Sequence, residues 1–203
     1  MLYNKMRQVM KEGVDMISYV GFIRGLNVGG KNKVAMSDLR FEFEQLNYQS
    51  VSTIGNTGVI FFDSDEEVEN DALSRQLTDK LGLEIKIVCL TFEKLLKIKS
   101  QLPDWWNQEK EWRHNVLFLL DEIDISHLTN QFPTFDESIE KAFVMDEAIF
   151  WASAFTERKD YYRSQYSKLM KHKVYKHVTI RNGNTLNKVF NKIEETGKKM
   201  GHS

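Results

Sequence analysis

The chain has 203 residues, of which 41% are hydrophobic and 28% charged, and its formal net charge at pH 7 is −1. This composition excludes disordered, collagen-like and disulfide-stapled proteins, and no apolar run approaches the roughly 18 residues that a membrane-spanning helix needs. The single cysteine, Cys89, cannot form an internal disulfide, so we expect a cytoplasmic protein with no membrane association.

Residues 1–15 are predicted to be a leader outside the folded protein. They lack the continuous apolar segment and the cleavage site of a secretory signal. Lys11-Glu-Gly can be encoded by a purine-rich sequence like a bacterial ribosome-binding site, and it lies shortly upstream of Met16. We hypothesise that translation starts at Met16. The alternative is a short N-terminal helix.

From Met16 onward, apolar periodicity predicts two halves with the same order of elements, β-α-β-β-α-β followed by one more helix. The first half, residues 16–101, is expected to contain strands at 17–24, 50–55, 58–63 and 84–90, helices at 37–46 and 67–81, and a helix starting after Thr91. Residues 102–112 hold three of the four tryptophans. We predict that they connect the two halves and wedge them together.

The second half, residues 113–203, is expected to contain strands at 113–120, 138–144, 147–153 and 175–181, and helices at 124–131, 159–171 and 185–197. The element order in each half is that of the split βαβ, or ferredoxin-like, motif. We therefore predict an α+β fold of two tandem ferredoxin-like (βαββαβ) domains. Their antiparallel sheets are expected to carry helices on one face.

A glycine-rich basic loop follows the first strand. Glycines allow positive φ and let backbone N–H groups approach an anion, which basic and amide side chains in the same loop would also bind. The residues predicted to contact an anionic ligand here are Arg24, Gly25, Asn27, Gly29, Gly30 and Lys31. The alternative is a turn whose glycines serve only the backbone geometry.

A second candidate site follows the last strand, where Arg181-Asn-Gly-Asn-Thr opens the last helix. Backbone N–H groups at a helix N-terminus bind anions. We predict ligand contacts from Arg181, Asn182, Asn184 and Thr185, with Lys168 nearby in the fold. The alternative is structural, with Asn184 or Thr185 serving only as the helix N-cap.

Charge is distributed unevenly along the chain. Residues 1–155 carry 16 basic and 25 acidic side chains, whereas residues 156–203 carry 12 and 4. In the basic segment, Tyr161, Tyr162, Tyr166 and Tyr175 alternate with basic residues such as Lys171, a pattern that suits nucleic acid. A solvated basic face, with some tyrosines in the core, is the alternative.

Gly25-Leu-Asn-Val-Gly-Gly-Lys31 also fits the phosphate loop of nucleotide hydrolases. Asn32 replaces the hydroxyl residue that would hold Mg²⁺, and the next helix begins only near Ser37. Hairpins in both halves also conflict with the parallel sheet of those enzymes. We reject this interpretation.

Five stretches of the sequence resemble the bacterial family known as domain of unknown function 1697. They are Tyr19–Lys33 with Met36 and Leu39, Thr53–Phe61, Arg113–Leu119, Ser167–Leu169 and Val178–Thr185. The resemblance implies two ferredoxin-like domains and names no activity. The chain departs from the family pattern at Gly183, where members carry tryptophan, and at Thr57, which is inserted in the hairpin.

The leading functional hypothesis is a protein that binds a phosphate-bearing small molecule or nucleic acid through the two loops. One alternative is an enzyme acting on a small anionic substrate through residues that no motif identifies. Another is a protein–protein adaptor. We expect no cofactor, and His172 with His177 makes too sparse a pattern to predict a metal site.

Overall fold

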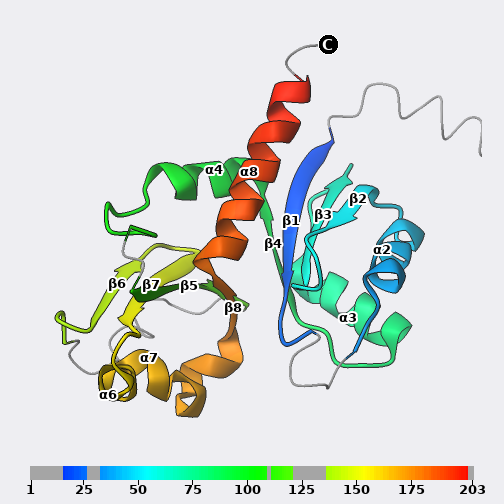
Figure 1. Ribbon diagram of the computed structural model, residues 1–203. Helices are drawn as coiled ribbons and strands as arrows, with labels where there is room; N and C mark the ends of the chain where they lie inside the picture. The colour runs from blue at the N-terminus through cyan, green and yellow to red at the C-terminus, as the bar shows by residue number, and fades with distance from the viewer. Residues whose placement is uncertain (1–15, 27–32, 109–110, 121–135, 201–203) are drawn as a thin grey trace, which may run out of the picture.

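The computed structural model describes residues 16–26, 33–108, 111–120 and 136–200 (Figure 1). The predicted leader at 1–15 and the predicted helix at 124–131 lie outside these residues. None of the helices in the described part of the chain has the length and apolar character that a bilayer span requires.

The strands form two four-stranded sheets in which every pair of neighbours is antiparallel. The first sheet has the order β2-β3-β1-β4 and the second has the order β6-β7-β5-β8. The strands are β1 (Ile17–Ile23), β2 (Gln49–Thr53), β3 (Val59–Ser64), β4 (Ile87–Thr91), β5 (Trp112–Leu119), β6 (Glu140–Val144), β7 (Ala148–Ala154) and β8 (Val178–Asn182). The second sheet therefore repeats the strand order of the first.

Helices follow the strands in both halves. They are α2 (Met36–Gln45), α3 (Asn70–Leu81), α4 (Phe92–Ser100), α6 (Arg158–Arg163), α7 (Gln165–Lys168) and α8 (Gly183–Met200), with short 3₁₀ turns η1 (Leu169–Lys171) and η2 (Lys173–His177). Thr91 caps α4 as predicted, because its hydroxyl accepts the Lys94 N–H at 3.1 Å.

Both faces of each sheet are buried, which corrects the prediction that helices pack on one face. In the first sheet, α2 and α3 cover the outer face, where Phe43 and Leu77 join a cluster with Phe62. The outer face of the second sheet carries Leu169 and Val174. The remaining two faces share one hydrophobic cluster that also contains the apolar sides of α4 and α8.

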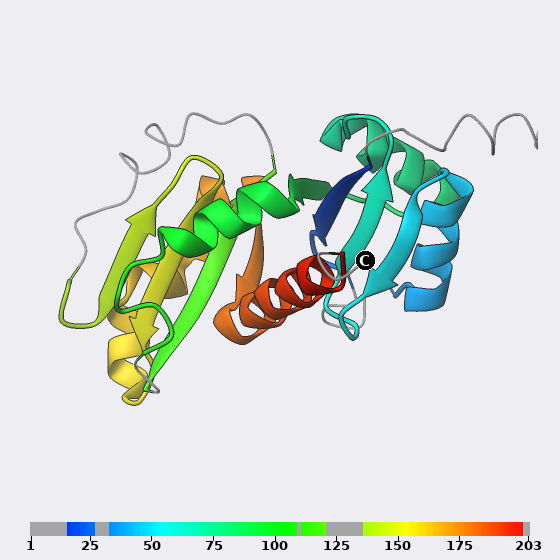
Figure 2. The same ribbon diagram turned by 90° about the horizontal axis from the view of Figure 1, so that it is seen from above.

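This shared cluster joins the two halves. Phe22 of β1 stacks on Phe118 of β5, with ring centroids 4.1 Å apart. Helix α8 lies between the two sheets in both views (Figures 1 and 2). Its Lys192 donates to the Ser52 hydroxyl of the first sheet at 2.7 Å, and Glu194 pairs with Lys99 of α4. Trp106 of the predicted connector is also buried in this cluster.

The predicted elements within the described residues have bounds within three residues of those observed, with one exception. The helix expected at 159–171 is broken at Ser164, whose ψ of 148° is extended. The Ser164 hydroxyl accepts the Ser167 N–H, and the buried Glu140 carboxylate accepts the Gln165 and Tyr166 N–H groups. These side chains accept hydrogen bonds from the backbone N–H groups at the start of α7. A new helix therefore begins there, and α6 ends before it.

We predict that the two halves unfold together and that Phe22 and Phe118 are energetically coupled. Phe22→Leu and Phe118→Leu should each destabilise by about 1–3 kcal/mol, because each removes buried ring contacts. In the double variant, the coupling free energy should be about 0.5–1.5 kcal/mol. Chemical denaturation followed by circular dichroism, which reports on both halves, measures both values.

The control pair is Phe22→Leu with Phe43→Leu, since Phe43 belongs to the separate outer cluster. Their effects should add within about 0.5 kcal/mol. Two separate unfolding transitions, or additive effects for Phe22 and Phe118, would contradict the shared core.

Candidate functional site

A pocket of about 440 Å³ lies where the end of β1 meets β8 and the start of α8. It brings together residues from both candidate sites, since Arg24 and Gly25 line it from the first half and Arg181, Asn182 and Thr185 from the second. Its other lining residues are Ile23, Leu26, Asn56, Thr57, Tyr175, Val178, Thr179 and Ile180. We call it the inter-sheet pocket.

The described lining of the inter-sheet pocket contains two arginines and no aspartate or glutamate. The pocket beside α3 and β4 differs, since Asp71, Asp79 and Glu84 line it. Besides the two arginines, the described lining is neutral, with both polar and apolar side chains. These side chains give the pocket a positive potential, which raises the local concentration of anions.

Arg181 is buried and links the two halves through hydrogen bonds. Its Nη2 donates to the carbonyl oxygens of Ile23 at 2.6 Å and Gly58 at 3.1 Å, both in the first half. Its Nη1 donates to the Thr179 hydroxyl at 2.9 Å and the Ile180 carbonyl at 2.7 Å. All four terminal N–H groups are thus used, and the Nε of Arg181 has no hydrogen-bond partner within the described part of the chain.

Burial lowers the pKa of the Arg181 guanidinium to about 10, so the side chain still carries its positive charge at neutral pH. In the described part of the chain it forms no ion pair with a carboxylate. Removing a charge from water without a counter-charge is costly, and carbonyl dipoles offset that cost only in part. Arg181 is therefore a buried cation that an anion in the pocket would neutralise.

Arg24 lies on the other side of the pocket and is partly buried. Its guanidinium stands over the Tyr175 ring, with Cζ 5.4 Å from the centroid, and Nη2 donates to the Tyr175 carbonyl at 3.4 Å. Within the described part of the chain, this one long hydrogen bond leaves most of its N–H groups available. Arg24 is the arginine with donors left for a ligand.

Asn182 is the N-cap of α8, because its Oδ1 accepts the Thr185 N–H at 2.8 Å. This corrects the alternative that placed the cap at Asn184 or Thr185. Asn182 also lines a second pocket, of about 630 Å³, on the other side of the β8–α8 junction. Asn184 lines only that second pocket, so the structure separates it from Arg24 and Arg181.

Five asparagines line the second pocket, together with three larger side chains and one glycine. These residues are Asn107, Asn115, Asn182, Asn184, Asn187, Trp112, Arg113, His114 and Gly183. A Cβ atom built on Gly183 would lie 2.3 Å from Oδ1 of Asn107. The absence of a side chain at position 183 therefore lets Asn107 pack against the start of α8.

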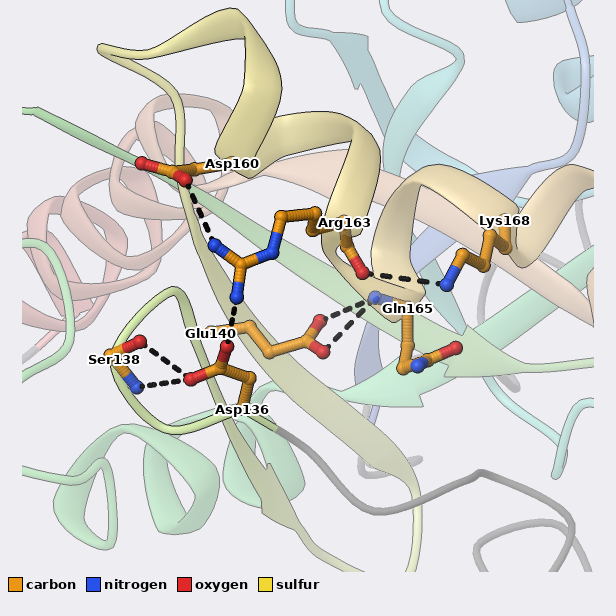
Figure 3. Close-up of polar contacts among 7 residues, drawn as sticks. All are labelled: Asp136, Ser138, Glu140, Asp160, Arg163, Gln165 and Lys168. Carbon is orange, nitrogen blue, oxygen red and sulfur yellow. Dashed lines mark hydrogen bonds and ion pairs between the residues drawn. The ribbon is translucent and has the colours of Figure 1, made fainter.

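Lys168 lies away from both pockets, among polar contacts near the α6–α7 break (Figure 3). Its Nζ donates to the Arg163 carbonyl at 3.4 Å. Lys171 is exposed in η1 and lines neither pocket. The predicted residues Asn27, Gly29, Gly30 and Lys31 lie outside the described residues.

Sequence reasoning missed the Gly58 carbonyl, Thr57 and Thr179 as parts of this site. The departure of Thr57 from the family hairpin was one available signal, because the hairpin supplies one wall of the pocket. The described residues contain no group of three potential metal ligands, and burial raises the pKa of the Cys89 thiol above its ordinary value.

We predict that Gly58→Ala destabilises the protein more than Gly82→Ala does. Both glycines have positive φ, 67° and 65°, so the backbone cost of alanine is the same. A Cβ at Gly58 would also lie 3.3 Å from Nη2 of Arg181 and 3.3 Å from the Ile23 carbonyl oxygen, whereas Gly82 has open space. Displacing the Arg181 contacts should add about 1–2 kcal/mol to the loss, measured by denaturant unfolding. Equal losses of stability in the two variants would contradict this prediction and show that the Arg181 hydrogen bonds tolerate displacement.

Residues 16–150 match a family described as "Protein of unknown function (DUF1697)". The solved structure of the conserved bacterial protein SP0830 from Streptococcus pneumoniae is similar, with a TM-score of 0.74 and 29% identity. The similarity covers 88% of this chain and 99% of that chain. No curated protein matches the sequence. Because the family match spans more than half of the 203 residues, the chain belongs to the DUF1697 family.

Proposed function

We propose that this protein binds a small phosphate-bearing anion in the inter-sheet pocket. The observation that carries the proposal is Arg181, a buried and charged side chain with no carboxylate partner among the described residues. It lines a pocket whose described residues include no acid. Binding an anion there would neutralise the cation and gain Coulomb energy in a medium of low dielectric constant.

Each contact has a distinct role in the proposed complex. Arg24 has most of its donors available and would make charge-assisted, bidentate hydrogen bonds to phosphate oxygens. The terminal N–H groups of Arg181 are used by carbonyl and hydroxyl oxygens, so it would contribute mainly its charge and hold the pocket walls together. The Thr185 hydroxyl lines the same space and would supply a neutral donor, whereas the hydroxyls of Thr57 and Thr179 already donate to the Ile54 and Ile23 carbonyls.

The strand order in each sheet supports a more specific assignment of the fold. In each half the first strand lies between the third and the fourth, and the second strand is at the edge. This is the order expected of the split βαβ unit, so we infer two ferredoxin-like domains with a boundary between residues 102 and 112. The single cysteine supports a cytoplasmic location for this scaffold.

We predict that phosphate-bearing probes stabilise the protein and that Arg24→Gln reduces the effect. Pyrophosphate, a pentose phosphate and a nucleoside monophosphate should be compared with ribose by differential scanning fluorimetry. A probe at 100 times its dissociation constant stabilises by about 2.7 kcal/mol, which is roughly 5–10 °C for a chain of this size. Arg24→Gln should weaken binding by about 10- to 100-fold, because a charge-assisted hydrogen bond is lost.

The matched control is Arg40→Gln. Arg40 is also a partly buried arginine of the first half, but its Nη1 donates to the Thr53 hydroxyl, away from the pocket. Arg40→Gln should bind the probes as the wild type does. If no phosphate-bearing probe raises the melting temperature, or if Arg24→Gln binds as tightly as wild type, the proposed function is wrong.

A further inference from the structure

A group of aromatic and basic side chains lies exposed on the second half, apart from the inter-sheet pocket. Arg113 comes from β5, Phe155 directly follows β7, and Arg158, Tyr161 and Tyr162 belong to α6. We call these five residues the aromatic–basic surface. Phe155 is 40% exposed and Tyr162 57% exposed, so their rings are open to solvent although both are large apolar groups.

The rings and guanidinium groups of this surface are in mutual contact. The Arg113 guanidinium stacks on Phe155, with Cζ 3.1 Å from the ring centroid. The Phe155 and Tyr161 centroids are 5.5 Å apart, and those of Tyr161 and Tyr162 are 5.7 Å apart. Arg158 completes the row, with Cζ 5.5 Å from the Tyr162 ring. Contacts of this kind hold the cations beside planar apolar faces.

The two arginines of the surface keep their charge available. The acidic neighbours Asp136 and Asp160 both pair with Arg163, at 2.9 and 3.5 Å (Figure 3). In the described part of the chain, Arg113 and Arg158 form no ion pair. Asp136 and Asp160 therefore neutralise Arg163, and the row of rings keeps two arginines that have no carboxylate partner among the described residues.

The asparagine-lined second pocket adjoins this surface, because Arg113 belongs to both. The described lining of that pocket contains no aspartate or glutamate. Each asparagine amide carries both donors and an acceptor, which is the combination that the edge of a nucleobase presents. Stacking faces, unpaired arginines and an amide pocket thus lie side by side.

We propose that the aromatic–basic surface binds single-stranded nucleic acid. Phe155 and Tyr162 stack on bases, Arg113 and Arg158 contact the phosphates, and an amide of the adjoining pocket hydrogen-bonds a base edge. A single strand fits because its bases expose the flat faces that these rings require, whereas a duplex keeps them stacked inside. The basic segment 156–203, with 12 basic and 4 acidic residues, supplies the attraction at longer range. None of the five surface residues lines the inter-sheet pocket.

The test is fluorescence anisotropy of the full chain with a labelled, mixed-sequence RNA of 12 nucleotides, repeated at several salt concentrations. Tyr162→Ala and Phe155→Leu should each weaken binding by roughly tenfold, since each removes one stacking ring. Arg113→Gln should weaken binding and make the slope of log K against log salt shallower by about 0.7, because one phosphate contact is lost. Melting temperatures close to that of wild type verify that the variants are folded. If Phe155→Leu does not fold, the RNA affinity of Tyr162→Ala decides the test.

The matched controls are Phe41→Ala and Arg75→Gln, an exposed ring and an exposed arginine on helices α2 and α3 of the first half. They should leave the affinity for RNA unchanged. The proposal is overturned if RNA does not bind at low salt, or if the controls weaken binding as much as the surface variants do. Competition by duplex RNA as effective as that by the single strand would also overturn it.

Discussion

The burial of the two inner sheet faces against each other is the constraint on which the rest of the structure depends. Phe22 and Phe118 stack at its centre, while α4 and α8 close its sides. Neither inner face could remain in water alone, because each carries a row of large apolar side chains. The two halves therefore fold as one body around a common core, and any site between them exists only while that core is intact.

Arg181 occupies a position that the first half fills with an apolar residue. Leu90 of β4 lies opposite Val20, two residues before Phe22, and Arg181 of β8 lies opposite Val116, two residues before Phe118. The repeated fold thus replaces a core leucine with a charged side chain at the equivalent place. A buried charge is costly unless its surroundings solvate it, and here the Ile23 and Gly58 carbonyls of the first half do so. Where Leu90 only packs in the core, Arg181 forms hydrogen bonds that join the two halves.

The sequence was sufficient for the order of strands and helices along the chain, since this order follows from local patterns. The sequence also indicated that both faces of the first sheet are buried. Val59–Phe62 is a continuous apolar run, which is typical of a strand covered on both sides. It could not show that Arg181 is buried, because the Ile23 and Gly58 carbonyls that it contacts lie 158 and 123 residues away. Nor could local periodicity show the break at Ser164, which depends on Glu140 of a distant strand.

The β8–α8 junction is where fold and proposed function meet. Asn182 caps α8 and lines both pockets, so one short segment fixes the wall between the inter-sheet pocket and the asparagine-lined pocket. An anion beside Arg181 would interact only with the docked halves, because Arg24 and Arg181 come from different sheets. Its binding free energy would therefore add directly to the stability of their contact. A buried cation without a carboxylate partner makes this coupling favourable, since the ligand supplies the counter-charge that the described part of the chain lacks.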